Sequence, residues 1–229
     1  MGLSHSPKIT TDGLVFCLDA ANQRSYPGSG AVWADLSGNF LDATGNASYI
    51  SPSGVTSGAS FSTTTTGILN TDVHSIFFMI KFNSSATYPD GTTATWEKIF
   101  SYNAGGSDRS PGIWRWPSER TIHWRYDPGN SGTDFGKSAA GTGNQFDLNI
   151  WYYVGVTKNG ANTVMYVNGV QVGTGSVSNP KTAGTAGIII NEYYSNPLNN
   201  VNCIQIYNRV LSATEVSRNY IALKSRFGL

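Results

Sequence analysis

Tryptophan alternates with arginine and histidine in one segment, residues 111–128, and this segment offers the clearest chemistry in the chain. Aromatic rings pack against the apolar faces of sugars, and a guanidinium group donates hydrogen bonds to hydroxyl or acidic groups. The segment therefore predicts a surface that binds a glycan or a protein partner. Its candidate ligand-binding residues are Trp114, Arg115, Trp116, His123, Trp124 and Arg125.

The same segment predicts a hairpin of two strands, 112–116 and 121–126. Because side chains alternate between the two faces of a strand, Trp114 shares a face with Trp116, and Trp124 lies on one face of the second strand. If these tryptophan faces coincide, one side of the hairpin is an aromatic core and the other is a strip of arginine and histidine. The alternative is structural, with tryptophans in the core and arginines that extend their charged ends to solvent.

The carboxylates show no catalytic spacing. Glycoside hydrolysis needs two of them, about 5–5.5 Å apart for retention or about 6.5–9.5 Å apart for inversion. None of the glutamates has a carboxylate two to five positions away. A nucleophile elbow, a phosphate-binding loop and zinc-ligand spacing are missing as well. We therefore expect no enzyme and no catalytic residues; the alternative is a glycanase or lyase whose carboxylates meet only in space.

Hard oxygen ligands gather in a long loop over residues 20–46. Asp35 and Asn39 lie in it, and Asp19 and Asp42 are near in sequence. Carboxylate and amide oxygens suit Ca²⁺, so Asp19, Asp35 and Asn39 are candidate calcium ligands. The alternative is that these side chains cap turns within the loop. No other cofactor is expected.

Composition limits the fold class and the partners. The chain has 229 residues, 15 Lys+Arg against 14 Asp+Glu, and a formal net charge of +1. A near-neutral balance argues against binding to nucleic acid or to a membrane surface. The N-terminus lacks the apolar core of a signal peptide. With 26 glycines and 12% aromatic residues, the chain is expected to be all-β with many turns.

Short alternating runs supply the strands that must position these residues. They are expected at 14–18, 47–50, 58–61, 75–82, 96–102, 112–116, 121–126, 150–157, 162–167, 170–173, 186–191 and 201–207. Asn159-Gly160 and Asn168-Gly169 predict the two tight turns of a meander, because a type I′ turn needs positive φ at both central residues. Ser212 and Glu215 predict a capping box at the start of one C-terminal helix. We expect a polar arm over 1–12 and a single domain over 13–229.

Three segments together resemble a known family. They are GLVFCLDAANQRSYPGSGAVWADLSGN from Gly13, WYYVGVTKNGANTVMYVNGVQVG from Trp151, and IQIYNRVLSATEVSRNYIALKSRFGL from Ile204. In this order they resemble laminin-G-like, concanavalin A-like jelly-roll lectin domains. The resemblance implies a two-sheet antiparallel sandwich with adjacent first and last strands. Cys17 and Cys203 would then be neighbours and a disulfide would become feasible, although their apolar surroundings favour buried free thiols.

The resemblance also implies a biological setting. Family members bind glycans or proteins, sometimes through calcium, and single-domain versions with the loop 25–30 and the ending 222–228 look similar to virion proteins of tailed bacteriophages. The expectation is a non-enzymatic virion surface protein made in the host cytoplasm, a head or tail decoration or a fibre-tip module. Its partners would be other virion proteins, further copies of itself and host-surface glycans. A free carbohydrate-binding lectin module is the alternative.

Overall fold

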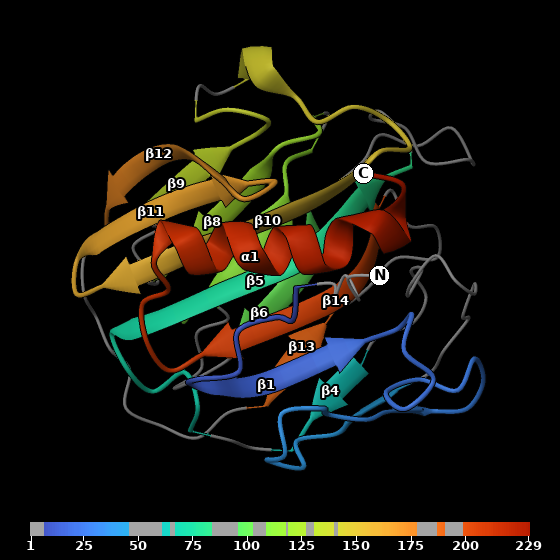
Figure 1. Ribbon diagram of the computed structural model, residues 1–229. Coiled ribbons are helices and arrows are strands. Elements are labelled where there is room, and N and C mark those ends of the chain that lie inside the picture. The colour runs from blue at the N-terminus through green and yellow to red at the C-terminus, as the bar shows by residue number, and fades with distance from the viewer. Residues whose placement is uncertain are drawn as a thin grey trace, which may run out of the picture.

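Two antiparallel sheets stacked face to face form the molecule, with one helix on the outside (Figure 1). The computed structural model describes residues 7–45, 61–64, 67–83, 96–102, 109–117, 119–126, 131–139, 142–177, 187–190 and 199–229. The expected strand 47–50 lies outside these residues, as does most of 58–61. The expected all-β jelly-roll sandwich is confirmed.

The six-stranded sheet has the order β1-β14-β5-β10-β11-β12, so the first and last strands of the chain are neighbours. Its strands are β1 (Leu14–Asp19), β5 (Val73–Phe82), β10 (Trp151–Asn159), β11 (Asn162–Val167), β12 (Val170–Ser176) and β14 (Asn199–Tyr207). The eight-stranded sheet has the order β2-β3-β4-β13-β6-β7-β8-β9. Its strands are β2 (Val32–Trp33), β3 (Ala43–Gly45), β4 (Phe61–Thr63), β6 (Glu97–Tyr102), β7 (Gly112–Arg115), β8 (Ile122–Arg125), β9 (Gly132–Phe135) and β13 (Ile188–Ile190).

The expected meander of β10, β11 and β12 forms, but its two turns differ. At the second turn Asn168 and Gly169 have φ of 50° and 79°, as a type I′ turn requires. At the first turn β10 extends through Asn159, which pairs with Asn162, and only Gly160 has positive φ. Gly160-Ala161 is therefore the central pair of the first turn, one residue later than the Asn-Gly motif predicts.

The main core lies between the sheets and is rich in aromatic residues. Phe78 of β5 stacks on Trp124 of β8 with ring centroids 5.8 Å apart, and Phe82 stacks on Phe146 at 5.1 Å. All four side chains are almost entirely buried. Burial of each such ring stabilises the fold by about 2–3 kcal/mol, and the Phe78–Trp124 pair joins the two sheets directly.

Helix α1 (Ala213–Lys224) covers the outer face of the six-stranded sheet, and the short 3₁₀ turns η1 (Thr142–Asn144) and η2 (Ser225–Phe227) complete the elements. The predicted capping box is present, because Ser212 Oγ accepts from the Glu215 amide and Glu215 Oε2 accepts from the Ser212 amide. Val216 and Leu223 are buried against β5 and β14, as expected. Within the described residues, no helix is long and apolar enough to cross a membrane.

The N-terminal segment is tied to the helix through Thr10. The Thr10 amide donates to Asn219 Oδ1 at 2.7 Å, Asn219 Nδ2 donates to the Tyr207 hydroxyl at 2.9 Å, and that hydroxyl donates to the Thr10 carbonyl at 3.0 Å. All three residues are buried or nearly so. This closed ring of hydrogen bonds joins the segment, α1 and β14.

Candidate functional site

The register of β7, β8 and β9 decides which residues of the Trp/Arg segment reach the surface. Trp114 lies opposite His123, and His123 lies opposite Asp134. On the other face of the sheet Ile113 lies opposite Trp124. The tryptophan faces of the two strands therefore do not coincide: Trp114 shares its face with His123, and Trp124 points into the core against Phe78.

Arg115 is not a surface residue either. It lies opposite Ile122 on the inward face and is 0% exposed. Its Nη1 lies 3.7 Å from Glu97 Oε2, its Nε donates to the Glu119 carbonyl at 2.9 Å, and its guanidinium lies over the Phe82 ring. Removing one partner of such a buried pair is strongly destabilising, because the remaining charge is left uncompensated. Arg115 and Trp124 are thus core residues and leave the candidate ligand site.

The outward face carries a cluster of rings that we call the tryptophan patch: Trp96, Trp114, Trp116 and His123. Trp96 lies 4.5 Å from Trp116 and 4.6 Å from His123 between ring centroids. His123 lies 5.2 Å from Trp116 and 5.9 Å from Trp114. Trp96 is 39% exposed whereas Trp114 is 8% exposed, so Trp96 presents far more of its ring to solvent than Trp114 does.

A charged group borders the tryptophan patch. Asp134 Oδ1 lies 2.8 Å from His123 Nδ1, and Asp134 Oδ2 accepts from Arg125 Nη2 at 2.9 Å. Burial alone would raise the pKa of Asp134, but hydrogen bonds from His123 and Arg125 outweigh it and lower the pKa to about 2. The carboxylate is therefore ionised at neutral pH and available as an acceptor beside the rings.

Arg125 connects the edge strands beneath this carboxylate. Its Nη1 donates to the carbonyls of Trp124 and Thr133, both at 2.9 Å. Gly132 makes the close approach feasible, since a Cβ there would lie 1.9 Å from the Trp124 carbonyl oxygen. Of the six predicted binding residues, the structure brings Trp114, Trp116, His123 and Arg125 to the outer face.

Two residues of this site were not predicted as such. Trp96 belongs to the expected strand 96–102 but is distant in sequence from the Trp/Arg segment, so only the pairing of β6 with β7 brings it there. Asp134 lies outside every strand that the sequence pattern predicts. The alternation Thr133-Asp134-Phe135, with a buried phenylalanine, is the signal that could have indicated strand β9.

The candidate calcium ligands are occupied by hydrogen bonds within the protein. Asp35 Oδ1 accepts from the amides of Cys17 and Ser37 at 2.8 and 2.9 Å, and Oδ2 accepts from the Ser37 hydroxyl at 2.7 Å. Asp19 Oδ2 accepts from Arg226 Nη1 at 2.7 Å, and Asn39 Nδ2 donates to the Val15 carbonyl. No group of three or more His, Cys, Asp or Glu side chains suited to a metal ion occurs among the residues described. These residues do not fit a calcium ion, and the geometry is that of capped turns.

The two cysteines are free and buried, as expected. They lie on neighbouring strands but are offset, because Cys17 is opposite Gln205 and Cys203 is opposite Asp19. Burial raises the pKa of the Cys17 thiol to about 12 and that of Cys203 well above its ordinary value. Both thiols are therefore protonated at neutral pH.

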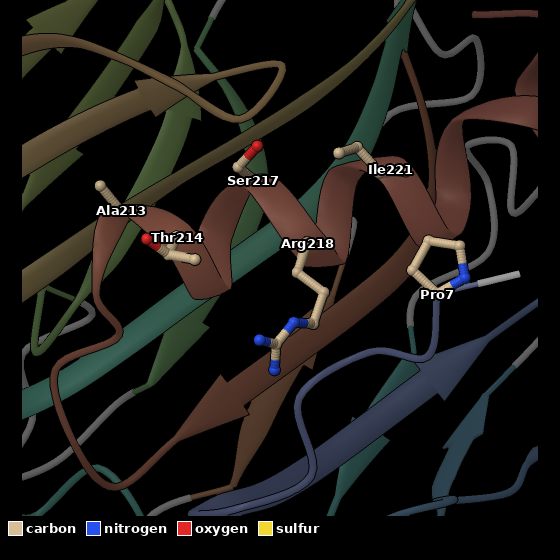
Figure 2. Close-up of a pocket in the computed structure, with 6 residues that line it drawn as sticks. All are labelled: Pro7, Ala213, Thr214, Ser217, Arg218 and Ile221. Carbon is tan, nitrogen blue, oxygen red and sulfur yellow. The ribbon is translucent and has the colours of Figure 1, made fainter.

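A hollow lies on the outer side of α1 (Figure 2). Thr214, Ser217 and Ile221 follow one side of the helix, Arg218 extends from it, and Pro7 lies near its C-terminal end. This hollow is open to solvent, and it has no aromatic residue in its lining. The tryptophan patch is the stronger candidate.

Comparison with known families agrees with this architecture. The family model for the concanavalin A-like lectin/glucanases superfamily matches residues 84–217, more than half of the chain. The chain belongs to the concanavalin A-like lectin/glucanase superfamily. The match spans strands β6 to β14 and therefore the whole tryptophan patch.

Solved structures of the same fold include enzymes and binding domains. A Trypanosoma rangeli sialidase in complex with sialic acid superposes with a TM-score of 0.64 and 15% identity, covering 94% of this chain and 33% of that chain. Another structure of this sialidase, in complex with 2,3-difluoro-KDN, has a TM-score of 0.66 and 17% identity, covering 93% and 33%. The botulinum neurotoxin serotype D binding domain has a TM-score of 0.66 and 16% identity, covering 92% and 52%.

These solved structures correct one expectation. Because sialidases are among them, the fold is found in enzymes, and the expectation that this chain is not an enzyme is overturned. The chain spans about a third of the sialidase chains and about half of the toxin chain. At sequence identities of 17% and 16%, the similarity to these structures is a similarity of fold alone. Comparison with curated proteins finds no match.

Proposed function

We propose that this protein binds carbohydrate on the tryptophan patch. The observation that carries the proposal is the cluster of indole rings on the outer face of β6 and β7, with Trp96 39% exposed beside them. An exposed indole packs against the C–H face of a pyranose ring. The superfamily includes lectins and glucanases, which supports a carbohydrate as the ligand.

The polar groups around the patch suit sugar hydroxyls. The Asp134 carboxylate is partly exposed and ionised, so it accepts hydrogen bonds from hydroxyl groups. The Arg109 guanidinium lies 5.7 Å from the Trp114 ring centroid, at the border of the patch, and can donate to hydroxyl or acidic groups. The patch thus combines an apolar platform with one acceptor and one donor, as sugar-binding sites require.

The experiment is a glycan array probed with the purified protein and with the Trp96→Ala variant. We expect the wild type to bind a defined set of glycans and the variant to lose that set. Phe40→Ala is the matched control, because Phe40 is an aromatic residue that is 85% exposed near the other end of the eight-stranded sheet. Loss in both variants, or binding retained by both, would contradict the proposal.

The biological setting that we propose is the surface of a tailed bacteriophage particle. The support is the resemblance of loop 25–30 and of the ending 222–228 to such virion proteins. In this setting the protein contacts other virion proteins and further copies of itself, and the tryptophan patch binds host-surface glycans. Co-purification with intact particles tests the setting independently of the glycan array, and absence from them would contradict it.

A further inference from the structure

A pocket of about 620 Å³ lies on the side of the molecule opposite the tryptophan patch. The N-terminal segment, β1, β14 and the end of α1 surround it, and Figure 1 shows this segment crossing β14 between α1 and β1. The Thr10, Tyr207 and Asn219 hydrogen bonds hold the segment in this place. The volume lies within the usual range for small-molecule sites.

Most of the pocket surface is apolar. Ile9, Leu14 and Leu36 line it from the segment, β1 and the long loop, and Leu223 lines it from α1. The two protonated thiols, Cys17 and Cys203, complete this surface. Such a lining binds a hydrocarbon chain.

One polar group in the lining lacks a partner. Gln205 is 0% exposed and lines the pocket from β14. Its Oε1 accepts from the Tyr153 hydroxyl at 2.8 Å, but its Nε2 has no acceptor among the residues that the structure describes. An unmet buried donor is unfavourable, so the pocket offers a hydrogen bond to a ligand oxygen.

The charged residues of the pocket favour an anion. Lys8, Arg24 and Arg226 line it together with one acidic residue, Asp19, which is paired with Arg226. Lys8 and Arg24 are exposed, and neither forms an ion pair with any described residue. Two uncompensated cations therefore remain for a carboxylate.

We propose that this pocket binds an amphiphilic carboxylate with a neutral oxygen at the far end of its hydrocarbon chain. The carboxylate lies with Lys8 and Arg24, the chain packs on the apolar lining, and the terminal hydroxyl or carbonyl oxygen accepts from Gln205 Nε2. This site is separate from the tryptophan patch, and its ligand is not a sugar.

The experiment measures binding of a homologous series of ω-hydroxy carboxylates by titration calorimetry. Each is compared with the plain carboxylate of equal length and with the corresponding diol. We expect one chain length to bind wild-type protein about tenfold more tightly than its plain carboxylate and its diol, since each comparison removes one polar contact. No binding of any hydroxy carboxylate at about 1 mM, or equal binding of all three compounds, overturns the proposal.

Substitutions of Lys8 and Arg24 test whether these residues bind the carboxylate. Lys8→Ala/Arg24→Ala should weaken the hydroxy carboxylate about tenfold and leave the diol unchanged. Arg218→Ala, an exposed cation of the neighbouring hollow, is the control and should change neither. An equal loss of hydroxy carboxylate binding in Arg218→Ala would show a general charge effect. It would overturn the placement of the carboxylate beside Lys8 and Arg24.

A test of the buried Gln205 donor requires a variant that still folds. Tyr153→Phe/Gln205→Met removes the donor and its hydroxyl partner together, which avoids leaving either of them unpaired. We expect it to bind the hydroxy and plain carboxylates equally, while Tyr153→Phe alone retains the preference. If the double variant retains the preference, Gln205 is not the donor. Trp96→Ala should bind every compound like wild type, which separates this test from that of the proposed function.

Discussion

His123 and Asp134 lie opposite each other on β8 and β9, with 2.8 Å between Nδ1 and Oδ1. The pair closes one side of the tryptophan patch, because the His123 ring contacts both Trp96 and Trp116. Asp134 therefore fixes the orientation of a ring on which the exposed indoles pack. This contact explains why a carboxylate at the sheet edge matters to an aromatic surface.

The first prediction concerns the pH dependence of stability. The pKa of Asp134 falls from 3.8 to about 2 on folding, so its ionised form is favoured in the folded state. Its contribution to stability is present above pH 3.8 and is lost as the pH falls through about 2. Because the side chain is 36% exposed, solvent screening reduces this contribution to about 1 kcal/mol.

Chemical denaturation of wild type and Asp134→Asn across pH measures this contribution. We expect the variant to be about 1 kcal/mol less stable at pH 6 and the two curves to converge toward pH 2. Asp12→Asn, a change at a carboxylate whose side chain is 85% exposed, is the control. A difference for Asp134→Asn that does not change with pH would show that its ionisation is not responsible.

Gly132→Ala should disrupt the edge that carries Asp134. A Cβ at this position would lie 1.9 Å from the Trp124 carbonyl oxygen, so β9 must move away from β8. We expect a loss of stability of about 2–3 kcal/mol and weaker glycan binding, measured by denaturation and calorimetry. Gly143→Ala is the matched control, because nothing lies within 4 Å of a Cβ added at Gly143. Equal effects of the two changes would refute the close-approach argument.

Arg115→Met should destabilise the fold by about 3–5 kcal/mol, because it leaves Glu97 buried without its cation. Arg115→Met/Glu97→Gln should recover a large part of this loss, since no buried charge remains. Equilibrium unfolding in urea gives both values. A mild effect of Arg115→Met, similar to that of an exposed arginine such as Arg24, would indicate that the pair is not structural.

Removal of divalent metal should leave glycan binding unchanged. Asp35 already accepts hydrogen bonds from Cys17 and Ser37, and Asp19 is paired with Arg226. A glycan array repeated in EDTA and in calcium measures whether glycan binding depends on divalent metal. Thermal unfolding under the same two conditions is a second readout. A hit that disappears in EDTA would contradict the capped-turn interpretation of the loop.

Local patterns were sufficient for the meander and the helix. Strict alternation through β10 and the Asn168-Gly169 turn specify the meander, and Ser212 with Glu215 specifies the helix start. These signals depend on residues close in sequence, so no knowledge of tertiary structure is needed. The one-residue shift of the turn at Gly160 shows their limit at element boundaries.

The tryptophan patch required information that the sequence pattern does not hold. Alternation gives the two faces of β7 and of β8, but not which face of one meets which face of the other, and a shift of one residue reverses the pairing. The register of β7 and β8 sets Trp114 opposite His123. Trp96 and Asp134 join from β6 and β9 through sheet pairing, which no local pattern predicts.

The measurement that tests the central claim most directly is calorimetric titration of the strongest array glycan into wild type, Trp96→Ala and Phe40→Ala. Truncation of an exposed indole that stacks on a sugar should weaken binding by about 10-fold or more. Thermal unfolding should change little, because Trp96 is 39% exposed. Our account predicts this loss for Trp96→Ala and wild-type affinity for Phe40→Ala. Wild-type affinity in Trp96→Ala would contradict the tryptophan patch as the carbohydrate site.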